Sequence, residues 1–261
     1  MNKLFKIATW NVNSLRIRLQ HVLEWLALSQ PDVLALQETK VEDKHFPEEA
    51  LRHAGYHVFF NGQKTYNGVA LISRLPMHNF TTTFTDFDDI QRRLLIANIG
   101  PLRLVNVYVP NGGSVNSDKY IYKLNWLSKL QDHLRQELTQ HPRLIVLGDF
   151  NIAPEDKDVH DPSIWEGHVL VSPLERQKLK DITILGLKDS FRLFNKEPGH
   201  YSWWDYRAGA FRRNNGLRID HILSSTALTS DCISCEIDKK VRGWERPSDH
   251  VPVIATYQNI N

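Results

Sequence analysis

One unbroken apolar run in the middle of the chain ends in a group of turn-forming and polar residues. Residues 144–147 are Leu-Ile-Val-Leu, a pattern typical of a buried strand. Gly148 follows, and then Asp149 and Asn151. Residues two apart on an extended backbone point the same way, so a carboxylate and an amide should emerge together from the strand end. That pair would suit a divalent metal, a water or a phosphate. A plain turn uses the same residue types, so the stretch alone does not decide.

The apolar pattern elsewhere predicts further strands and four helices. Strands are expected at residues 6–10, 33–36, 56–60, 68–73, 94–99, 102–109, 217–223, 233–237 and 251–257. The first helix follows Ser14, a candidate N-cap, and carries apolar residues at Leu15, Leu19, Val22 and Leu26. Helices are also expected at 47–54, 118–140 and 173–185, the last behind a capping box that begins at Ser172. Helix 118–140 carries on one face Leu127, Leu130, Leu134 and Leu138.

Strands outnumber helices in this pattern, and the two kinds of element are mixed throughout the chain. This organisation favours an α/β or α+β fold with hairpins over a strict series of βαβ units. The sequence contains no linker rich in Pro, Gly or Ser and no low-complexity segment. We therefore expect residues 1–261 to form a single domain.

Composition and charge narrow the class of protein only a little. The chain has 261 residues, 41% hydrophobic and 24% charged, and these values are typical of a soluble globular protein. No apolar run approaches the ~20 residues of a membrane span, and the N-terminus lacks a signal-peptide region. We therefore expect an intracellular, cytoplasmic protein without a membrane partner. The net charge of +2 is mild, so a nucleic-acid binder would need its positive charge gathered on one face.

The two cysteines have CxxC spacing, but their surroundings do not favour a metal or redox motif. Cys235 lies in the strand expected at residues 233–237 and Cys232 directly precedes it, and residues three apart on a strand should face opposite sides. The sequence has no second cysteine pair to complete a zinc site. We therefore expect two ordinary thiols.

Polar residues gather where the expected strands end. The groups are Asn11 with Asn13, Glu38, Tyr108 with Asn111, Asp149 with Asn151, and the pairs Asp220-His221 and Asp249-His250. One carboxylate at a strand end is usually a turn residue, but carboxylates at four strand ends beside amides and histidine point to a shared site. Oxygen ligands of this kind select hard cations such as Mg²⁺ or Mn²⁺.

The motifs that hold these groups, taken in order, resemble the exonuclease III family of abasic-site endonucleases. They are Trp10-Asn11-Val12-Asn13, Leu36-Gln37-Glu38-Thr39-Lys40, Val107-Tyr108-Val109-Pro110-Asn111, Leu147-Gly148-Asp149-Phe150-Asn151-Ile152, Leu217-Arg218-Ile219-Asp220 and Arg246-Pro247-Ser248-Asp249-His250. Each motif is weak alone, but six in order, spread over residues 7–257, are specific. The resemblance implies a four-layer α/β sandwich of two packed mixed sheets flanked by helices.

The resemblance also implies roles for the strand-end residues. Glu38 would hold Mg²⁺, with Mn²⁺ as a substitute, and Asp149 would position and deprotonate the attacking water. Asn151 would orient that water or donate to a phosphate oxygen. Tyr108 and His250 would contact the non-bridging phosphate oxygens, and Asp220 would orient His250 and favour its protonated form.

The metal region implied by the resemblance is wider than Glu38 alone. Asn11 would hold the neighbouring carboxylates, and Asp249 would complete the region directly or through water. The full candidate set is Asn11, Glu38, Asp149, Asn151, Asp249 and His250. Asn13 departs from the part of the family that carries Asp there, so a ligand at that position is in doubt. His221 should face away from Asp220 on the strand, and we interpret it as structural.

Aromatic and cationic residues alternate near the C-terminal motifs, at residues 201–207 and 211–215. Such mixtures suit phosphate contacts with stacking or a sugar pocket, although aromatic clusters are more often core. Similar loops in the family surround an extrahelical abasic sugar. The candidate DNA-binding residues are Trp203, Arg207, Arg212, Arg213, Leu217 and Trp244.

The function implied is a Mg²⁺-dependent DNA repair phosphodiesterase that cuts 5′ to an abasic site. Trimming of 3′ blocking groups and 3′-to-5′ exonuclease activity are also expected, on double-stranded DNA and by a monomer. One alternative is another metal-dependent phosphoesterase of the superfamily, such as a nonspecific nuclease, a deadenylase or a phosphoinositide phosphatase. The other is a DNA-binding module without catalysis, against which intact Glu38, Asp149 and His250 argue.

Overall fold

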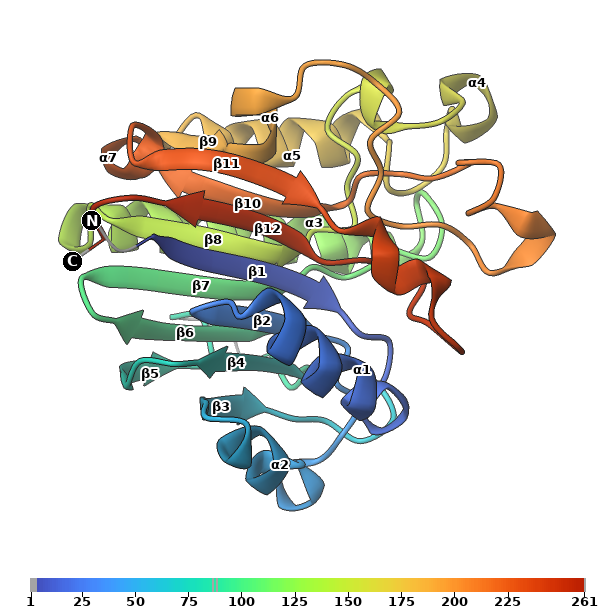
Figure 1. The fold of residues 1–261 in the computed structure, drawn as a ribbon. Helices are drawn as coiled ribbons and strands as arrows, with labels where there is room; N and C mark the ends of the chain where they lie inside the picture. The colour runs from blue at the N-terminus through green and yellow to red at the C-terminus, as the bar shows by residue number, and fades with distance from the viewer. Residues whose placement is uncertain (1–3, 86, 88, 261) are drawn as a thin grey trace.

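The computed structural model describes residues 4–85, 87 and 89–260 and contains two six-stranded sheets (Figure 1). The first sheet has the order β11-β12-β1-β2-β4-β3 and comprises β1 (Phe5–Asn11), β2 (Val33–Gln37), β3 (His57–Asn61), β4 (Val69–Ser73), β11 (Cys232–Ile237) and β12 (Val253–Tyr257). The second has the order β5-β6-β7-β8-β10-β9 and comprises β5 (Met77–Thr81), β6 (Leu94–Ile99), β7 (Leu102–Tyr108), β8 (Leu144–Asp149), β9 (Leu187–Asp189) and β10 (Asp220–Ser225). Both sheets are mixed, because β1 runs parallel to β2 and β7 runs parallel to β8.

Helices cover the outer faces of the two packed sheets (Figure 1). The α-helices are α1 (Leu15–Ser29), α2 (Glu48–His53), α3 (Asp118–Gln140), α4 (Pro162–Trp165), α5 (Pro173–Thr183), α6 (Ser190–Phe194) and α7 (Thr226–Thr229). Short 3₁₀ turns occur at η1 (Asp43–His45), η2 (Asp156–Asp158), η3 (Arg207–Gly209) and η4 (Lys239–Gly243). None of the described helices combines the length and the apolar character needed to cross a membrane. The arrangement confirms the predicted four-layer α/β sandwich.

The packing of β8 explains why its sequence shows no polar alternation. Ile145 and Leu147 lie in the core between the two sheets. Leu144 and Val146 lie in a second core, beneath α3 and α5. Both faces of the strand are therefore buried, and each position favours an apolar residue.

The predicted elements are present with few changes, and the differences have local causes. β5 and β9 were not predicted, because β5 is a mostly exposed edge strand and β9 has three residues. β10 begins at Asp220 instead of residue 217, since Leu217 forms isolated bridges with Trp203 and Val159. Ser14 directly precedes α1, but its side chain makes no capping hydrogen bond. The capping box at Ser172 is formed.

The predicted orientation of the two cysteines is wrong. A register shift between Cys232 and Ser234 interrupts the pairing of β11 with β12. An irregularity of this kind reorients the side chains that follow it, and Cys232 and Cys235 both pack into the core between the sheets. Both are free thiols, and burial raises the pKa of each above its ordinary value.

A buried ion cluster ties η2 to the start of β10. Arg218 Nε donates to Asp158 Oδ1 at 2.6 Å, and Arg192 pairs with the same carboxylate. Arg218 also lies 2.8 Å from Asp189. Burial opposes the charged form of Asp158, but the two guanidinium groups hold the pKa of its carboxyl below the usual range. This cluster fixes the segment that leads into Asp220.

We expect Asp158→Asn to lower the free energy of unfolding by ~3–5 kcal/mol near neutral pH, because buried guanidinium groups lose their shared partner. The native pKa of Asp158 is depressed, so the wild-type advantage is present above the unfolded-state pKa of about 4 and is lost as the pH falls through the native pKa. Urea unfolding at neutral and acidic pH measures this difference. Asp205→Asn, which breaks an exposed pair with Arg207, is the control and should leave the transition in place. A difference that persists at low pH would contradict the assignment.

Candidate active site

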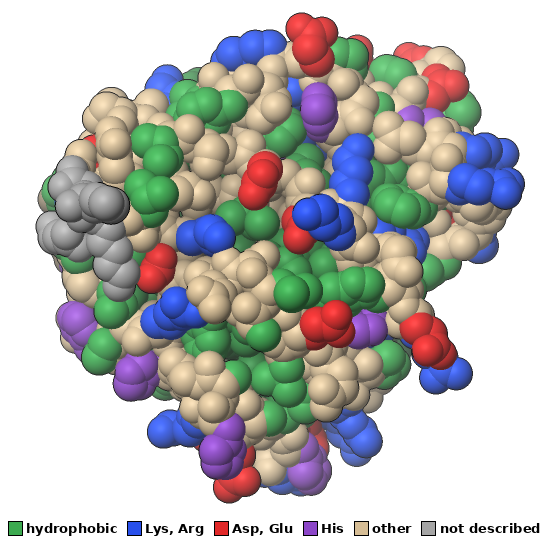
Figure 2. Space-filling model, in the orientation of Figure 1, with side chains coloured by type: hydrophobic (Ala, Val, Ile, Leu, Met, Phe, Trp, Pro, Cys, Tyr) green, Lys and Arg blue, Asp and Glu red, His purple; other side chains and the backbone are tan. Residues whose placement is uncertain are grey.

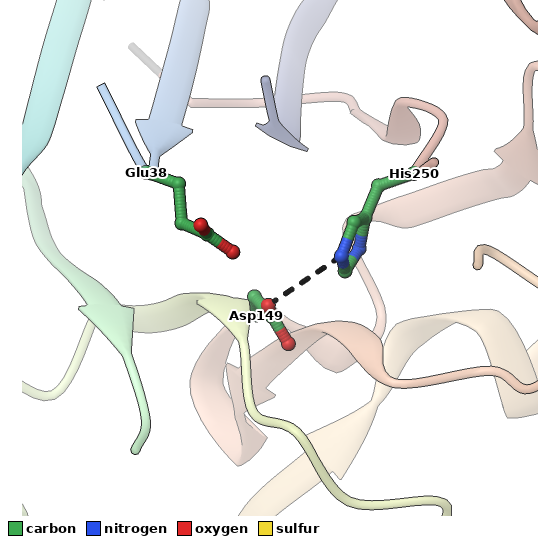
Figure 3. A group of neighbouring side chains, drawn as sticks. All are labelled: Glu38, Asp149 and His250. Atoms are coloured by element: carbon green, nitrogen blue, oxygen red, sulfur yellow. Dashed lines mark ion pairs between the residues drawn. The ribbon is translucent and has the colours of Figure 1, made fainter. Parts of the chain in front are cut away.

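The chemically distinctive residues converge at one edge of the two packed sheets. Asn11 ends β1, Glu38 follows β2, and Tyr108 and Asp149 end β7 and β8. Asp220 begins β10 and is paired directly with Asp149 across the antiparallel ladder. Figure 3 shows Glu38, Asp149 and His250 pointing toward a common point. Because these residues lie at or next to strand ends, the hydrogen-bonded sheets hold their side chains in position.

Gly148 is required by the close approach of β8 to β7. Its backbone has φ +145°, and a Cβ at this position would lie 1.9 Å from the carbonyl oxygen of Val107. Any side chain would therefore displace the strand that carries Asp149. The glycine is part of the site's geometry and not only a turn residue.

Asn11 connects the two carboxylates of the site. Its Nδ2 donates to Glu38 Oε1 and to Asp149 Oδ2, both at 2.8 Å. Its Oδ1 accepts the backbone N–H of Asn13 at 3.0 Å. Both polar atoms of Asn11 are thus bonded to protein groups, which favours the holding role over direct contact with an ion.

Three residues could hold a metal ion together. Each of Glu38, Asp149 and His250 offers a ligand atom, and these atoms lie within 4.8 Å of one another. Burial raises the pKa of Asp149 to about 7, against the opposing effect of His250, and the carboxylates of Asp220 and Glu38 raise it further. A divalent cation would offset this concentration of negative charge, so the donor set fits a hard cation.

Among the described residues, Asp249 is not one of the three that could hold a metal ion together. It is bonded to protein groups instead. Its carboxylate accepts hydrogen bonds from Asn13 Nδ2 and Trp203 Nε1, both at 2.9 Å. Burial opposes its charge, but His250 and these two donors hold the pKa of Asp249 below its usual range. Asn13 therefore supports Asp249 here.

His250 is oriented by Asp220. The Nδ1–H of His250 donates to Asp220 Oδ2 at 2.9 Å, and Ser202 Oγ donates to the same oxygen at 2.6 Å. Burial lowers the pKa of His250, but the carboxylates of Asp220 and then Asp149 outweigh it and raise the pKa to about 10. A protonated imidazole has no lone pair for a metal, so this arrangement favours a hydrogen-bond donor over a ligand.

Tyr108 is kept neutral by its surroundings. Burial, followed by the carboxylates of Glu38 and Asp149, raises the pKa of Tyr108 well above its ordinary value. The guanidinium of Arg93 lies 4.7 Å from the centre of the ring. The hydroxyl therefore keeps its proton and can donate a hydrogen bond.

Asn151 occupies a constrained position beyond β8. Its backbone has φ +50°, and its N–H donates to Asp149 Oδ1 at 2.8 Å. Its side-chain Nδ2 donates to the carbonyl of Val109 at 3.0 Å, and its Oδ1 accepts from Asn111 at 3.2 Å. The amide is thereby held against the carboxylate that it would assist.

Comparison with known proteins agrees with this geometry. Residues 8–250 match the model of the Endonuclease/Exonuclease/phosphatase family. The chain is 36% identical to exodeoxyribonuclease III of Haemophilus influenzae over 97% of this chain and all of that protein. It belongs to the exonuclease III and AP endonuclease family.

Solved structures of the exonuclease III family match over nearly the whole chain. A Neisseria protein described as the 3′ phosphatase NExo, bound to a product DNA hairpin, is 44% identical with a TM-score of 0.96, and the match covers 97% of this chain and 99% of that one. An AP endonuclease from Archaeoglobus fulgidus is 40% identical with a TM-score of 0.94, with the same coverage. The chain is a phosphodiester hydrolase of the exonuclease III type. Full-length likeness to these DNA enzymes favours this family over the other superfamily phosphoesterases.

Two supporting residues of this exonuclease III-type site were not found from the sequence. Ser202 bonds to Asp220, and no sequence signal marks it. Lys123 lies on the apolar face of α3, one and two turns before Leu127 and Leu130, and is fully buried. A lysine in register with an apolar stripe was the available signal.

The candidate DNA-binding residues occupy different environments. Trp203 is half-buried and bonds to Asp249, and its ring meets that of Trp165 edge-on at 6.3 Å. Leu217 is fully buried. It could therefore contribute to a sugar pocket only through Trp203, with which it forms an isolated β-bridge. Trp244 is half-buried and packs against His21.

The candidate arginines lie at the surface. Arg212 and Arg213 are exposed, and Arg207 is exposed and paired with Asp205. On the face shown in Figure 2, Lys and Arg side chains are interspersed with Asp and Glu, so the described residues form no large positive patch on this side. His221 is buried away from the site, with Nε2 2.8 Å from the carbonyl of Ile152, which agrees with a structural role.

Proposed function

We propose that this chain removes 3′-phosphates and 3′-terminal nucleotides from double-stranded DNA with Mg²⁺, for which Mn²⁺ can substitute. We also propose that it cuts the backbone 5′ to abasic sites. The observation that carries the proposal is the convergence of Glu38, Asp149 and His250 in a chain 44% identical to a 3′ phosphatase. The likeness to an AP endonuclease at 40% identity supports the second activity.

The site's own residues divide the reaction among them. Glu38 and Asp149 would hold Mg²⁺, which when bound polarises a phosphate oxygen. Asp149 is buried at the strand end, where it can accept the proton of an attacking water. Asn151 is held against Asp149 and would orient that water.

Charge that grows on the phosphate needs donors in fixed positions. The ring of His250 is turned by Asp220 so that Nε2 faces the site, 3.8 Å from Asp149 Oδ2. Tyr108 presents a protonated hydroxyl beside Glu38. Both would donate to non-bridging oxygens of the substrate.

The proposal is tested with matched DNA substrates. A hairpin with a 3′-phosphate, the same hairpin with a 3′-hydroxyl, and a duplex with an abasic analogue are incubated with Mg²⁺ or with chelator. We expect phosphate release, nucleotide release and incision, each abolished by the chelator. Activity that persists in the chelator, or hydrolysis of phosphoinositides in place of DNA, would contradict the proposal. We also propose that a monomer acts, and light scattering under turnover conditions checks this.

Replacing Trp203 separates a sugar pocket from a purely structural role. Trp203→Ala removes the ring and the N–H that bonds to Asp249, whereas Trp203→Phe removes that N–H but keeps a smaller aromatic ring. If the ring forms a pocket wall, Trp203→Ala should erode the preference for abasic over intact duplex by about tenfold or more, the scale of one stacking contact. Trp203→Phe should retain that preference. The measurement is kcat/KM on abasic, intact and 3′-phosphate substrates.

Arg212→Ala with Arg213→Ala is the control for the pocket experiment. Both arginines are exposed, and their removal should weaken the binding of all duplexes alike. The salt slope of binding should fall by up to ~1 for each phosphate that the protein no longer neutralises. If Trp203→Ala leaves the abasic preference intact, or Trp203→Phe loses it equally, the pocket hypothesis is wrong.

A further inference from the structure

Lys123 is a fully buried lysine of α3 whose ammonium group lies beneath the candidate active site. Its Nζ donates to the backbone carbonyl of Asn151 at 2.7 Å and to that of Asn111 at 3.1 Å. It also donates to Oε1 of Glu175. An ammonium group has three donors, so all three are used, and two of them hold backbone carbonyls of loops that border the site.

Glu175 is itself fixed at the start of α5. It is fully buried, and its Oε1 accepts the backbone N–H of Leu170 at 3.0 Å. Its Oε2 accepts the backbone N–H of Ser172 at 3.1 Å and the hydroxyl of Ser172 at 2.5 Å. The carboxylate is thus anchored by the capping box, and it gives Lys123 a rigid counter-ion.

The two loops that Lys123 joins meet over the reacting groups. Asn111 Nδ2 donates to Asn151 Oδ1 at 3.2 Å, and Asn151 Nδ2 lies 3.3 Å from Asp149 Oδ2. Gly112 packs on the lysine stem, since a Cβ there would lie 3.2 Å from Lys123 Cδ. Asn151 has a left-handed backbone, which asparagine adopts more readily than most residues other than glycine, and Lys123 bonds to its carbonyl.

Core packing alone does not require this arrangement. Burying a lysine and a glutamate costs several kcal/mol per ion, and apolar residues of similar volume often stabilise a fold as well or better. A second ion pair that involves α3, between Arg103 of β7 and Glu137, offers a comparison. Glu137 lies 14 residues from Lys123, about 21 Å along the helix, and Arg103 otherwise bonds to Asn79 and Asn98. That pair is far from the site, whereas Lys123 contacts two loops of the site.

We propose that Lys123, anchored by Glu175, is a positioning residue that sets the placement of Asn151 and Asn111 over the reacting phosphate. This rests on the proposed function for the substrate that the site accepts. Lys123 acts through the two backbone carbonyls and does not touch the substrate. Its removal should lower turnover more than it weakens DNA binding.

The test uses the double variant Lys123→Met/Glu175→Gln. Lys123→Met alone would leave a buried unpaired carboxylate, and the second change removes that charge. We expect kcat on the 3′-phosphate hairpin to fall by about 10- to 100-fold, the scale of a small misplacement of catalytic groups, with KM nearly unchanged. Backbone hydrogen exchange in residues 109–113 and 149–153 should become faster.

The matched control is Arg103→Met/Glu137→Gln, which removes the ion pair between β7 and α3. It should lower thermal stability without changing kcat or exchange in the two loops. Wild-type kcat in the Lys123 variant together with unchanged exchange would overturn the proposal. Recovery of wild-type kcat and wild-type exchange at a lower temperature, where the variant is stable again, would also overturn it. If the wild-type protein fails to release 3′-phosphate, the proposed function is wrong, and the exchange comparison still decides the role of Lys123.

Discussion

Asp149→Asn should lower kcat by at least ~10²-fold, the usual cost of losing a general base. Asparagine keeps the shape of the side chain, and Asn11 can still donate to its oxygen, but it cannot take a proton from water. DNA affinity should be kept or improved, because one negative charge leaves a site that receives phosphate. Single-turnover cleavage of the 3′-phosphate hairpin, with binding measured separately, checks both halves of the expectation.

The control for this substitution is Asp132→Asn, which removes the same charge from the exposed surface of α3, where Asp132 pairs with Arg135. It should leave kcat and binding unchanged. Near-normal turnover in Asp149→Asn would place the base elsewhere. A large loss of DNA affinity would mean that Asp149 serves mainly to hold the cation, and not to accept a proton.

Glu38→Gln should raise the Mg²⁺ concentration needed for half-maximal activity by at least ~10-fold, since loss of even an outer partner of a metal ligand costs 10- to 100-fold in affinity. Gln keeps the oxygen that accepts from Asn11 at 2.8 Å. It loses the charge that pairs with Lys40 at 2.8 Å and that would face the cation. A Mg²⁺ titration of kcat is the measurement, with thermal unfolding to show that the fold is retained.

Glu42→Gln is the matched control for Glu38, because Glu42 lies nearby but pairs with the exposed side chains of Lys44 and His45. It should leave the Mg²⁺ requirement unchanged. An unchanged titration in Glu38→Gln would remove Glu38 from the metal site. Asp149 would then have to bind the ion together with residues outside the group of Glu38, Asp149 and His250.

His250 could serve as a metal ligand or as a hydrogen-bond donor to the phosphate. The position of its ring permits a metal ligand, since one nitrogen lies near Glu38 and Asp149. The hydrogen bond to Asp220 occupies the other nitrogen and favours the protonated ring. A hydrogen bond to the phosphate therefore fits this structure better than metal coordination. His250 and Tyr108 would then both donate to the substrate.

The amino-acid sequence by itself determined the framework and indicated candidate residues that the structure brings together. Unbroken apolar runs such as residues 144–147 are local signals of a buried strand, and β8 is buried on both faces. The polar residues at the strand ends are equally local, because the strand that carries each of them is contiguous in the chain. Six motifs in order were enough to indicate the family, to which the chain belongs.

Only the tertiary structure decided how those groups are supported and which surfaces they present. The contacts of Asn11 with Asp149, of Ser202 with Asp220 and of Trp203 with Asp249 join residues 138, 18 and 46 positions apart. No local pattern encodes such pairs, since each depends on how the two sheets and the loops pack. The same holds for the burial of Leu217 and for the irregularity that turns both cysteines inward. Lys123 shows the limit most clearly, because helical spacing places it on the buried face but not against the two loops that it joins.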